Sequence, residues 1–158
     1  RVETLRTLEG YVDIYLPDVK YFSEQLAVEL SSAPHYFETA MNAVAEMVRQ
    51  TGSPEFSGNM LKKGVIVRHL VLPWHYKDSV EVIKRVGERF GKNVLFSLMS
   101  QYTPFWKAKD IPGLDRRITT FEYRKALEAV YAAGLDGFMQ ERSSAKEEYT
   151  PDFDLSGI

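Results

Sequence analysis

Cysteine is absent from the 158 residues of the sequence. A disulfide, a thiolate metal site and a cysteine nucleophile are therefore excluded within these residues. A chain without disulfides is compatible with the reducing cytoplasm, and we expect the protein to be cytoplasmic.

A long apolar run and a strong net charge are lacking as well. The longest apolar run, at 65–73, is interrupted by Arg68 and His69 and is far shorter than the roughly 20 apolar residues that cross a bilayer. The formal net charge is only −2, and no stretch of basic residues would attract a phosphate backbone. We therefore expect no membrane span and no nucleic-acid partner.

The composition that remains is typical of a globular protein, with 44% hydrophobic and 27% charged residues. The length suits one domain, so we predict that residues 1–158 fold as a single domain. The first residues, RVETLRTLEG, contain neither an initiating methionine nor an apolar signal core. We expect the chain to be a piece of a longer protein.

Motifs of common nucleotide-binding and hydrolytic enzymes are also missing. The sequence contains no GxGxxG, GxxxxGK[ST], GxSxG or HExxH. Its histidines, His35, His69 and His75, do not repeat a known metal-ligand spacing, so we predict no metal site. We expect His69 to pack between a strand and a helix.

Two hydrophobic periods alternate along the chain. Val12, Ile14 and Leu16 recur at every second position, as in a strand, and the same spacing extends to Asp18 and Lys20. Other segments carry apolar residues at helical spacing. We predict strands at 12–20, 64–73, 94–100 and 137–140, helices at 23–30, 34–52, 78–91 and 119–134, and loops at 51–59 and 103–117.

Two of the predicted helices begin with capping-box pairs, Asp78 with Glu81 and Thr119 with Glu122. Strands that alternate with helices imply crossover connections, so we predict the α/β fold class with a parallel sheet covered by helices. A doubly wound sheet and a β/α barrel both fit this order. In either architecture functional groups lie at the carboxyl ends of the strands.

Charged and aromatic side chains follow the predicted strands at those ends. Two cations, one carboxylate, hydroxyls and an apolar surface suit a small zwitterion, or an anion with an aromatic part. An ion pair of Asp18 with Lys20 or Arg68 that closes the end of the sheet is an alternative of about equal weight. If even-numbered positions face one side, the converging residues are Asp18, Lys20, Arg68, Leu70, Ser100 and Tyr102.

Three sequence blocks, taken together, resemble a known family. They are DIYLPDVKYF at 13–22, GVIVRHLVLPWHYKDS at 64–79 and FSLMSQYTP at 96–104, supported by MVRQTG at 47–52 and EEYTPDFD at 147–154. In order and spacing they resemble the second half of pyruvate formate-lyase activating enzymes and of their activating-enzyme-like relatives in the radical S-adenosylmethionine superfamily.

The resemblance implies a partial TIM-type barrel, (β/α)6, of which this chain would be the C-terminal half. In that family a loop with the motif CxxxCxxC holds a [4Fe-4S] cluster, and the cluster binds and reductively cleaves S-adenosylmethionine. The resulting 5′-deoxyadenosyl radical abstracts hydrogen from a glycine of a partner protein, a glycyl-radical enzyme such as pyruvate formate-lyase.

The resemblance also implies that five residues bind the cofactor. Lys20 would approach the methionyl carboxylate of S-adenosylmethionine, and Asp18 would fix the same end of the pocket. Arg68 falls on a family arginine, and Leu70 falls on a position near adenine. Tyr102 stands where the activating enzymes carry histidine.

Three family features are missing: the CxxxCxxC motif, a glycine-rich GGE segment and the first three strands. Trp74 also replaces a glycine that is common in the family. Without cluster ligands the chain itself is expected to be inactive, and we assign no catalytic residue. Half a barrel leaves an open edge and an uncovered face, so we expect the chain to self-associate.

Two other functions are consistent with the same residues. In one, Lys20 forms a Schiff base in an aldolase-like barrel. In the other, the chain is a non-catalytic binding domain that keeps the fold without the cluster.

Overall fold

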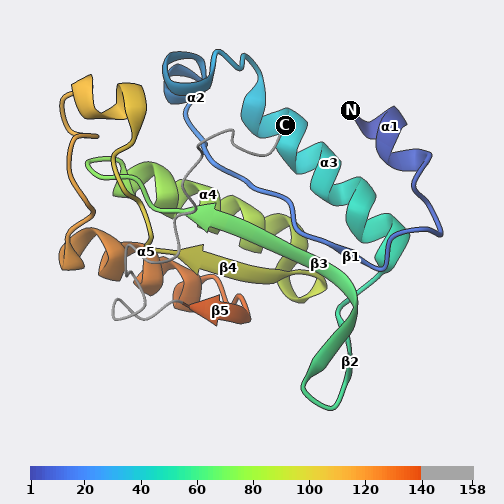
Figure 1. Cartoon of the computed structure of the whole chain (residues 1–158). Helices are drawn as coiled ribbons and strands as arrows, with labels where there is room; N and C mark the ends of the chain where they lie inside the picture. Colours follow the sequence, from blue (N-terminus) through green and yellow to red (C-terminus); the bar gives the residue numbers. More distant parts are fainter. Residues whose placement is uncertain (140–158) are drawn as a thin grey trace, which may run out of the picture.

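The computed structural model describes residues 1–139, apart from the side chains of Trp106 and Lys107. None of the helices in this part of the chain is long and apolar enough to cross a membrane. The strands are β1 (Ile14–Tyr15), β2 (Glu55–Ser57), β3 (Met60–Leu70), β4 (Leu95–Met99) and β5 (Gly137–Met139) (Figure 1). The helices are α1 (Val2–Arg6), α2 (Glu24–Ser31), α3 (Tyr36–Thr51), α4 (Tyr76–Phe90) and α5 (Thr120–Ala132), with short 3-10 helices η1 (Gly91–Asn93) and η2 (Trp106–Asp110).

The strands form a mainly parallel sheet in the order β1-β3-β4-β5. Helix α4 makes the crossover from β3 to β4, and α5 makes the crossover from β4 to β5. The short strand β2 pairs with the start of β3 in the antiparallel sense. The predicted α/β class with a parallel sheet is confirmed, and the strand order follows the chain without a reversal.

One face of the sheet is buried under the long helices. On β3 the buried Val65, Val67 and His69 alternate with the half-buried Ile66 and Arg68. The apolar residues on the buried side pack with α3, α4 and α5 into one core, and α4 runs behind β3 and β4 in Figure 1. This core includes Tyr15, Met41, Val44, Val65, Val67, Val82, Val86, Phe96, Leu98, Ala126 and Val130.

The opposite face of the sheet keeps apolar side chains that the helices of residues 1–139 leave accessible. Leu16, just after β1, is 51% exposed, and Phe138 on β5 is 52% exposed. Ile66 and Leu70 on β3 and Met99 on β4 are half-buried. These five residues define what we call the open face.

A β-hairpin replaces part of the loop predicted at 51–59. Strand β2 lies within that range, and β3 begins at Met60 rather than at Gly64. All three residues of β2 are exposed, and a segment this short is too brief for a period of two to be recognised in the sequence. The polar composition of this segment predicted a loop, and only the pairing of β2 with β3 identifies the strand.

The first predicted strand is regular over two residues only, Ile14–Tyr15. Pro17 has no N–H to donate, which interrupts the ladder. Pairing resumes at an isolated parallel bridge between Asp18 and Arg68. There the Arg68 N–H donates to the Pro17 carbonyl over 2.8 Å, and the Val19 N–H donates to the Arg68 carbonyl over 3.0 Å.

One predicted capping box is confirmed and the other is wrong. Thr119 and Glu122 bond each other reciprocally at the start of α5. Helix α4 begins two residues earlier than predicted, with His75 as its N-cap and no side-chain cap, so Asp78 lies within the first turn. The Asp78 carboxylate accepts hydrogen bonds from the backbone amides of Phe22 and Ser23, over 3.0 and 2.7 Å. The Asp78 carboxylate thus binds backbone amides of the segment before α2 and not those of its own helix.

Glu122 also joins two loops. Its carboxylate accepts hydrogen bonds from the Arg116 side chain over 2.8 and 2.9 Å, and from the backbone amides of Thr119 and Trp74, over 2.7 Å each. These bonds, above all those from Arg116, lower the pKa of Glu122 from 4.5 to about 2. The loop after β3 and the loop before α5 therefore meet at one buried carboxylate.

We expect Glu122→Gln to lower the free energy of unfolding by on the order of 2–3 kcal/mol, because it removes the charge that satisfies Arg116. Urea unfolding at neutral pH measures this loss. Since the folded-state pKa is lowered, the contribution is present above pH 4.5 and is lost as the pH falls toward about 2.

The control variant is Glu128→Gln, which removes an exposed pair with Lys125 and should leave the stability nearly unchanged. Equal losses in the two variants would show that Glu122 is no more important than a surface carboxylate.

Candidate functional site

The carboxyl ends of β1 and β3 contribute to a cavity of about 290 Å³, which we call the rim pocket. Small-molecule sites typically measure roughly 300–1,000 Å³, so the rim pocket stands at the lower end of that range. Four of the five residues predicted to bind a cofactor are brought together here, and Tyr102 is not among them. The rim pocket is lined by Asp18, Lys20, Tyr21, Arg68, Leu70, Leu72 and Met99.

Asp18 and Arg68 form an ion pair at the mouth of the rim pocket. The Arg68 Nε donates to Asp18 Oδ1 over 2.8 Å, and the two side chains are 40% and 37% exposed. A pair this accessible contributes at most about 1 kcal/mol to stability. Lys20 is exposed beside the pair. The ion pair that was predicted as the alternative to a binding site is thus present. Because both side chains are partly exposed, a charged ligand could still compete for them.

Leu70 and Met99 provide the apolar floor of the rim pocket, as register partners on β3 and β4. Ser100 was predicted to share this face, and that prediction is wrong. Arg68 pairs with Ser97, so odd positions of β4 share a face with even positions of β3. Ser100 is instead buried, with the parity of the helix-covered side.

Tyr102 lies in the loop after β4, beside the rim pocket. Its hydroxyl donates to the Leu114 carbonyl over 2.8 Å, and burial raises the pKa of the phenol. The side chain lines a second cavity, of about 580 Å³, which shares Tyr21 and Leu72 with the rim pocket. The predicted contact of Tyr102 with a cofactor therefore requires a ligand that extends from one cavity into the other.

Three residues that line the rim pocket were not predicted from the sequence: Tyr21, Leu72 and Met99. Met99 was missed because the parity of β4 was misassigned. Tyr21 directly follows Lys20, and strict alternation predicts that it faces the other way. Alternation applies only while the chain stays extended, and the chain leaves the sheet here to enter α2.

Trp74 follows β3 and has a left-handed backbone conformation, with φ of +66°. This conformation favours glycine, the residue common at this position in the family that the sequence resembles, and it costs other residues about 1–2 kcal/mol. Two contacts offset the cost: the Trp74 N–H donates to Glu122 over 2.7 Å, and the Arg116 guanidinium lies over the indole ring at 5.6 Å. The loop thus keeps a glycine-like backbone although tryptophan occupies the position.

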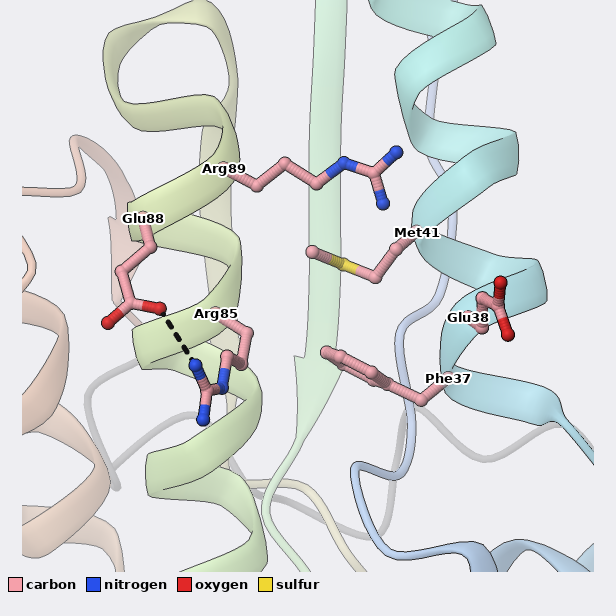
Figure 2. A pocket seen from close by; sticks show the side chains of 6 residues that line it. All are labelled: Phe37, Glu38, Met41, Arg85, Glu88 and Arg89. Atoms are coloured by element: carbon pink, nitrogen blue, oxygen red, sulfur yellow. Dashed lines mark hydrogen bonds and ion pairs between the residues drawn. The ribbon is translucent and has the colours of Figure 1, made fainter.

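A surface groove of about 400 Å³ lies between α3 and α4, away from the rim pocket (Figure 2). Phe37 and Met41 of α3 turn toward α4, while Arg85 and Glu88 pair along α4 over 3.2 Å. Arg89 donates to a side chain of α3 over 3.0 Å. The groove shares no residue with the rim pocket, so its side chains provide control positions.

His69 faces away from the rim pocket and is buried in the core, 2% exposed. Its Nδ1 lies 2.7 Å from the Val19 carbonyl, which can only accept, so Nδ1 carries the hydrogen. Among residues 1–139, Nε2 has no hydrogen-bond partner. Burial lowers the pKa of His69, which keeps the ring neutral.

We expect His69 to make stability depend on pH. Because its folded-state pKa is lowered, the unfolded chain takes up a proton first, and stability falls as the pH drops below 6.5, by up to about 1.4 kcal/mol per pH unit. His69→Asn keeps a donor for Val19 and cannot titrate. The difference between wild type and His69→Asn in urea unfolding from pH 7.5 to 5.5 measures the effect.

His35→Asn is the matched control, because the His35 side chain is 84% exposed. It should retain the wild-type pH dependence. An unchanged slope in His69→Asn would mean that another group causes the loss of stability.

Comparison with known proteins identifies one relative whose name states no activity. A protein of Methanocaldococcus jannaschii described as "Uncharacterized protein MJ0674" is 33% identical over 137 residues, which cover 85% of this chain and 36% of that protein. No family model and no solved structure matches the chain. The chain therefore spans about a third of the length of this curated relative.

Proposed function

We propose that this chain is the C-terminal part of a radical S-adenosylmethionine enzyme of the activating type, in which the rim pocket holds one side of S-adenosylmethionine. The observation that carries the proposal is the convergence of Asp18, Lys20, Arg68 and Leu70 on one cavity at the carboxyl ends of the strands. Asp18 and Arg68 stand 50 positions apart in sequence. Their adjacency is therefore a product of strand pairing.

The strand order supports a barrel rather than a doubly wound sheet. In a doubly wound sheet the order reverses at a switch point, whereas each strand of a barrel lies beside its predecessor. The order β1-β3-β4-β5 shows no reversal, and the long helices bury a single face. We therefore extend the α/β assignment to the C-terminal half of a partial (β/α)6 barrel, with the open face as its interior.

The residues of the rim pocket fit part of S-adenosylmethionine. Lys20 and Arg68 supply cations for the methionyl carboxylate, and Asp18 orients Arg68 through their ion pair. Leu70 and Met99 supply an apolar surface for the adenine side of the ligand. Because the pocket measures only about 290 Å³, this chain would contribute one wall and the remainder would come from elsewhere in the full-length protein.

The [4Fe-4S] cluster has no possible thiolate ligand in this chain, which contains no cysteine. When bound elsewhere in the full-length protein, the cluster would supply the electron that cleaves the cofactor. The residues of this chain would bind and orient the cofactor, and the chain alone would be inactive. A glycyl-radical enzyme is the partner class that the resemblance favours.

An aldolase-like function of Lys20 is the second candidate. Lysines that form Schiff bases are activated by burial or by a neighbouring cation, and Arg68 lines the same pocket as Lys20. Trapping of a carbonyl substrate on Lys20 by borohydride would favour this candidate. Sequencing of a CxxxCxxC motif upstream of this region would favour the radical enzyme over both the aldolase and a non-catalytic binding domain.

We expect Lys20→Ala and Arg68→Ala, made in the full-length protein, each to raise the Kd for S-adenosylmethionine by about 10- to 100-fold, because each removes a charge-assisted contact. Anaerobic isothermal titration measures the affinity. Arg85→Ala in the groove between α3 and α4 should leave the Kd unchanged. Wild-type affinity in both pocket variants would exclude the rim pocket as the cofactor site.

We expect the isolated chain to self-associate through the open face, because that face exposes apolar side chains. Light scattering across a range of concentrations measures the mass. Leu16→Glu should shift the chain toward the monomer, whereas Phe56→Glu on β2, where the side chain is also 51% exposed, should not. A wild-type chain that stays monomeric at high concentration would exclude this association.

A further inference from the structure

The backbone that carries Asp18 and Lys20 is held by a side chain from another element. Past the bridge to Arg68, regular ladder pairing of this segment ends. The hydroxyl of Tyr36, the first residue of α3, donates to the Asp18 carbonyl over 3.0 Å and accepts from the Lys20 N–H over 3.0 Å. One hydroxyl therefore bonds both backbone groups that flank Val19.

Neighbouring contacts hold the same segment from other directions. The His69 ring donates to the Val19 carbonyl over 2.7 Å from β3. Asp78 on α4 accepts from the backbone amides of Phe22 and Ser23, further along the segment. The Tyr21 ring packs edge to face on the Tyr36 ring, with centroids 5.4 Å apart. Side chains of α3, β3 and α4 thus replace the sheet ladder around residues 18–23.

We propose that Tyr36 is a positioning residue of the rim pocket, which aims the Asp18 and Lys20 side chains by fixing the peptide groups on either side of Val19. The identity of the ligand, S-adenosylmethionine, depends on the function proposed above. Tyr36 is not among the residues that line the rim pocket, so it acts through the backbone.

The physical reason lies in the geometry of an extended chain. Asp18 and Lys20 point to the same side only while Val19 keeps its strand conformation. A backbone residue that is not fixed retains about 1–2 kcal/mol of conformational entropy at room temperature, which a ligand would have to overcome on binding. Tyr36 removes that freedom before any ligand arrives.

Tyr36→Phe in the full-length protein tests this role, because it removes the hydroxyl and keeps the ring. Hydrogen exchange, followed by mass spectrometry on peptides that cover residues 18–23, should become about 10-fold faster at Lys20, while the exchange of β3 and β4 stays unchanged. Tyr131→Phe is the matched control, since Tyr131 is 69% exposed, and it should leave this exchange unaltered.

The second measurement is the affinity for S-adenosylmethionine. Tyr36→Phe should raise the Kd by about 10-fold without a matching change in the melting temperature, which a purely structural role would lower. Faster exchange with unchanged affinity would overturn the positioning role, and unchanged exchange would overturn the proposal outright.

A wild-type protein that binds no S-adenosylmethionine would defeat the proposed function instead. In that case the exchange measurement alone decides whether Tyr36 fixes the segment.

Discussion

The parallel pairing of Asp18 with Arg68 is the contact on which the site depends. Two backbone hydrogen bonds and one side-chain ion pair join segments that are 50 positions apart in sequence. Because side chains alternate along extended chains, a slip of one residue would send Asp18 and Lys20 to the core and Val19 to the pocket. The backbone register therefore sets both the composition of the rim pocket and the integrity of the core beside it.

The two faces of strand β3 have different roles, one in the stability of the core and the other in the rim pocket. His69 is buried and neutral among core residues, while its neighbour Arg68 is charged and half-buried on the other face. The core side packs against three helices and supplies most of the stabilising burial. The pocket side stays accessible, so polar groups there remain free of the large cost of burying unpaired charge.

Beyond the strand ends, single polar side chains bind the backbone groups that strand pairing would bind inside the sheet. Tyr36 and Asp78 fasten the segment after β1, and Glu122 fastens the loop after β3 at Trp74. Loops leave backbone amides without regular partners, and those amides need acceptors when the loop packs against the protein. The same bonds limit how far the walls of the rim pocket can move.

Local pattern was sufficient to predict the buried strands, the long helices and the Thr119 capping box, because periodicity and caps depend on residues a few positions apart. It also selected Asp18, Lys20, Arg68 and Leu70, since strand ends in parallel sheets share an edge. Local pattern did not predict the exposed strand β2, and it placed Ser100 on the pocket face where Met99 lies. It also predicted that Asp78 caps its own helix, which it does not. These features, like the contact between Tyr36 and Lys20, were decided only by the tertiary structure, because strand register and long-range hydrogen bonds depend on which distant segments meet.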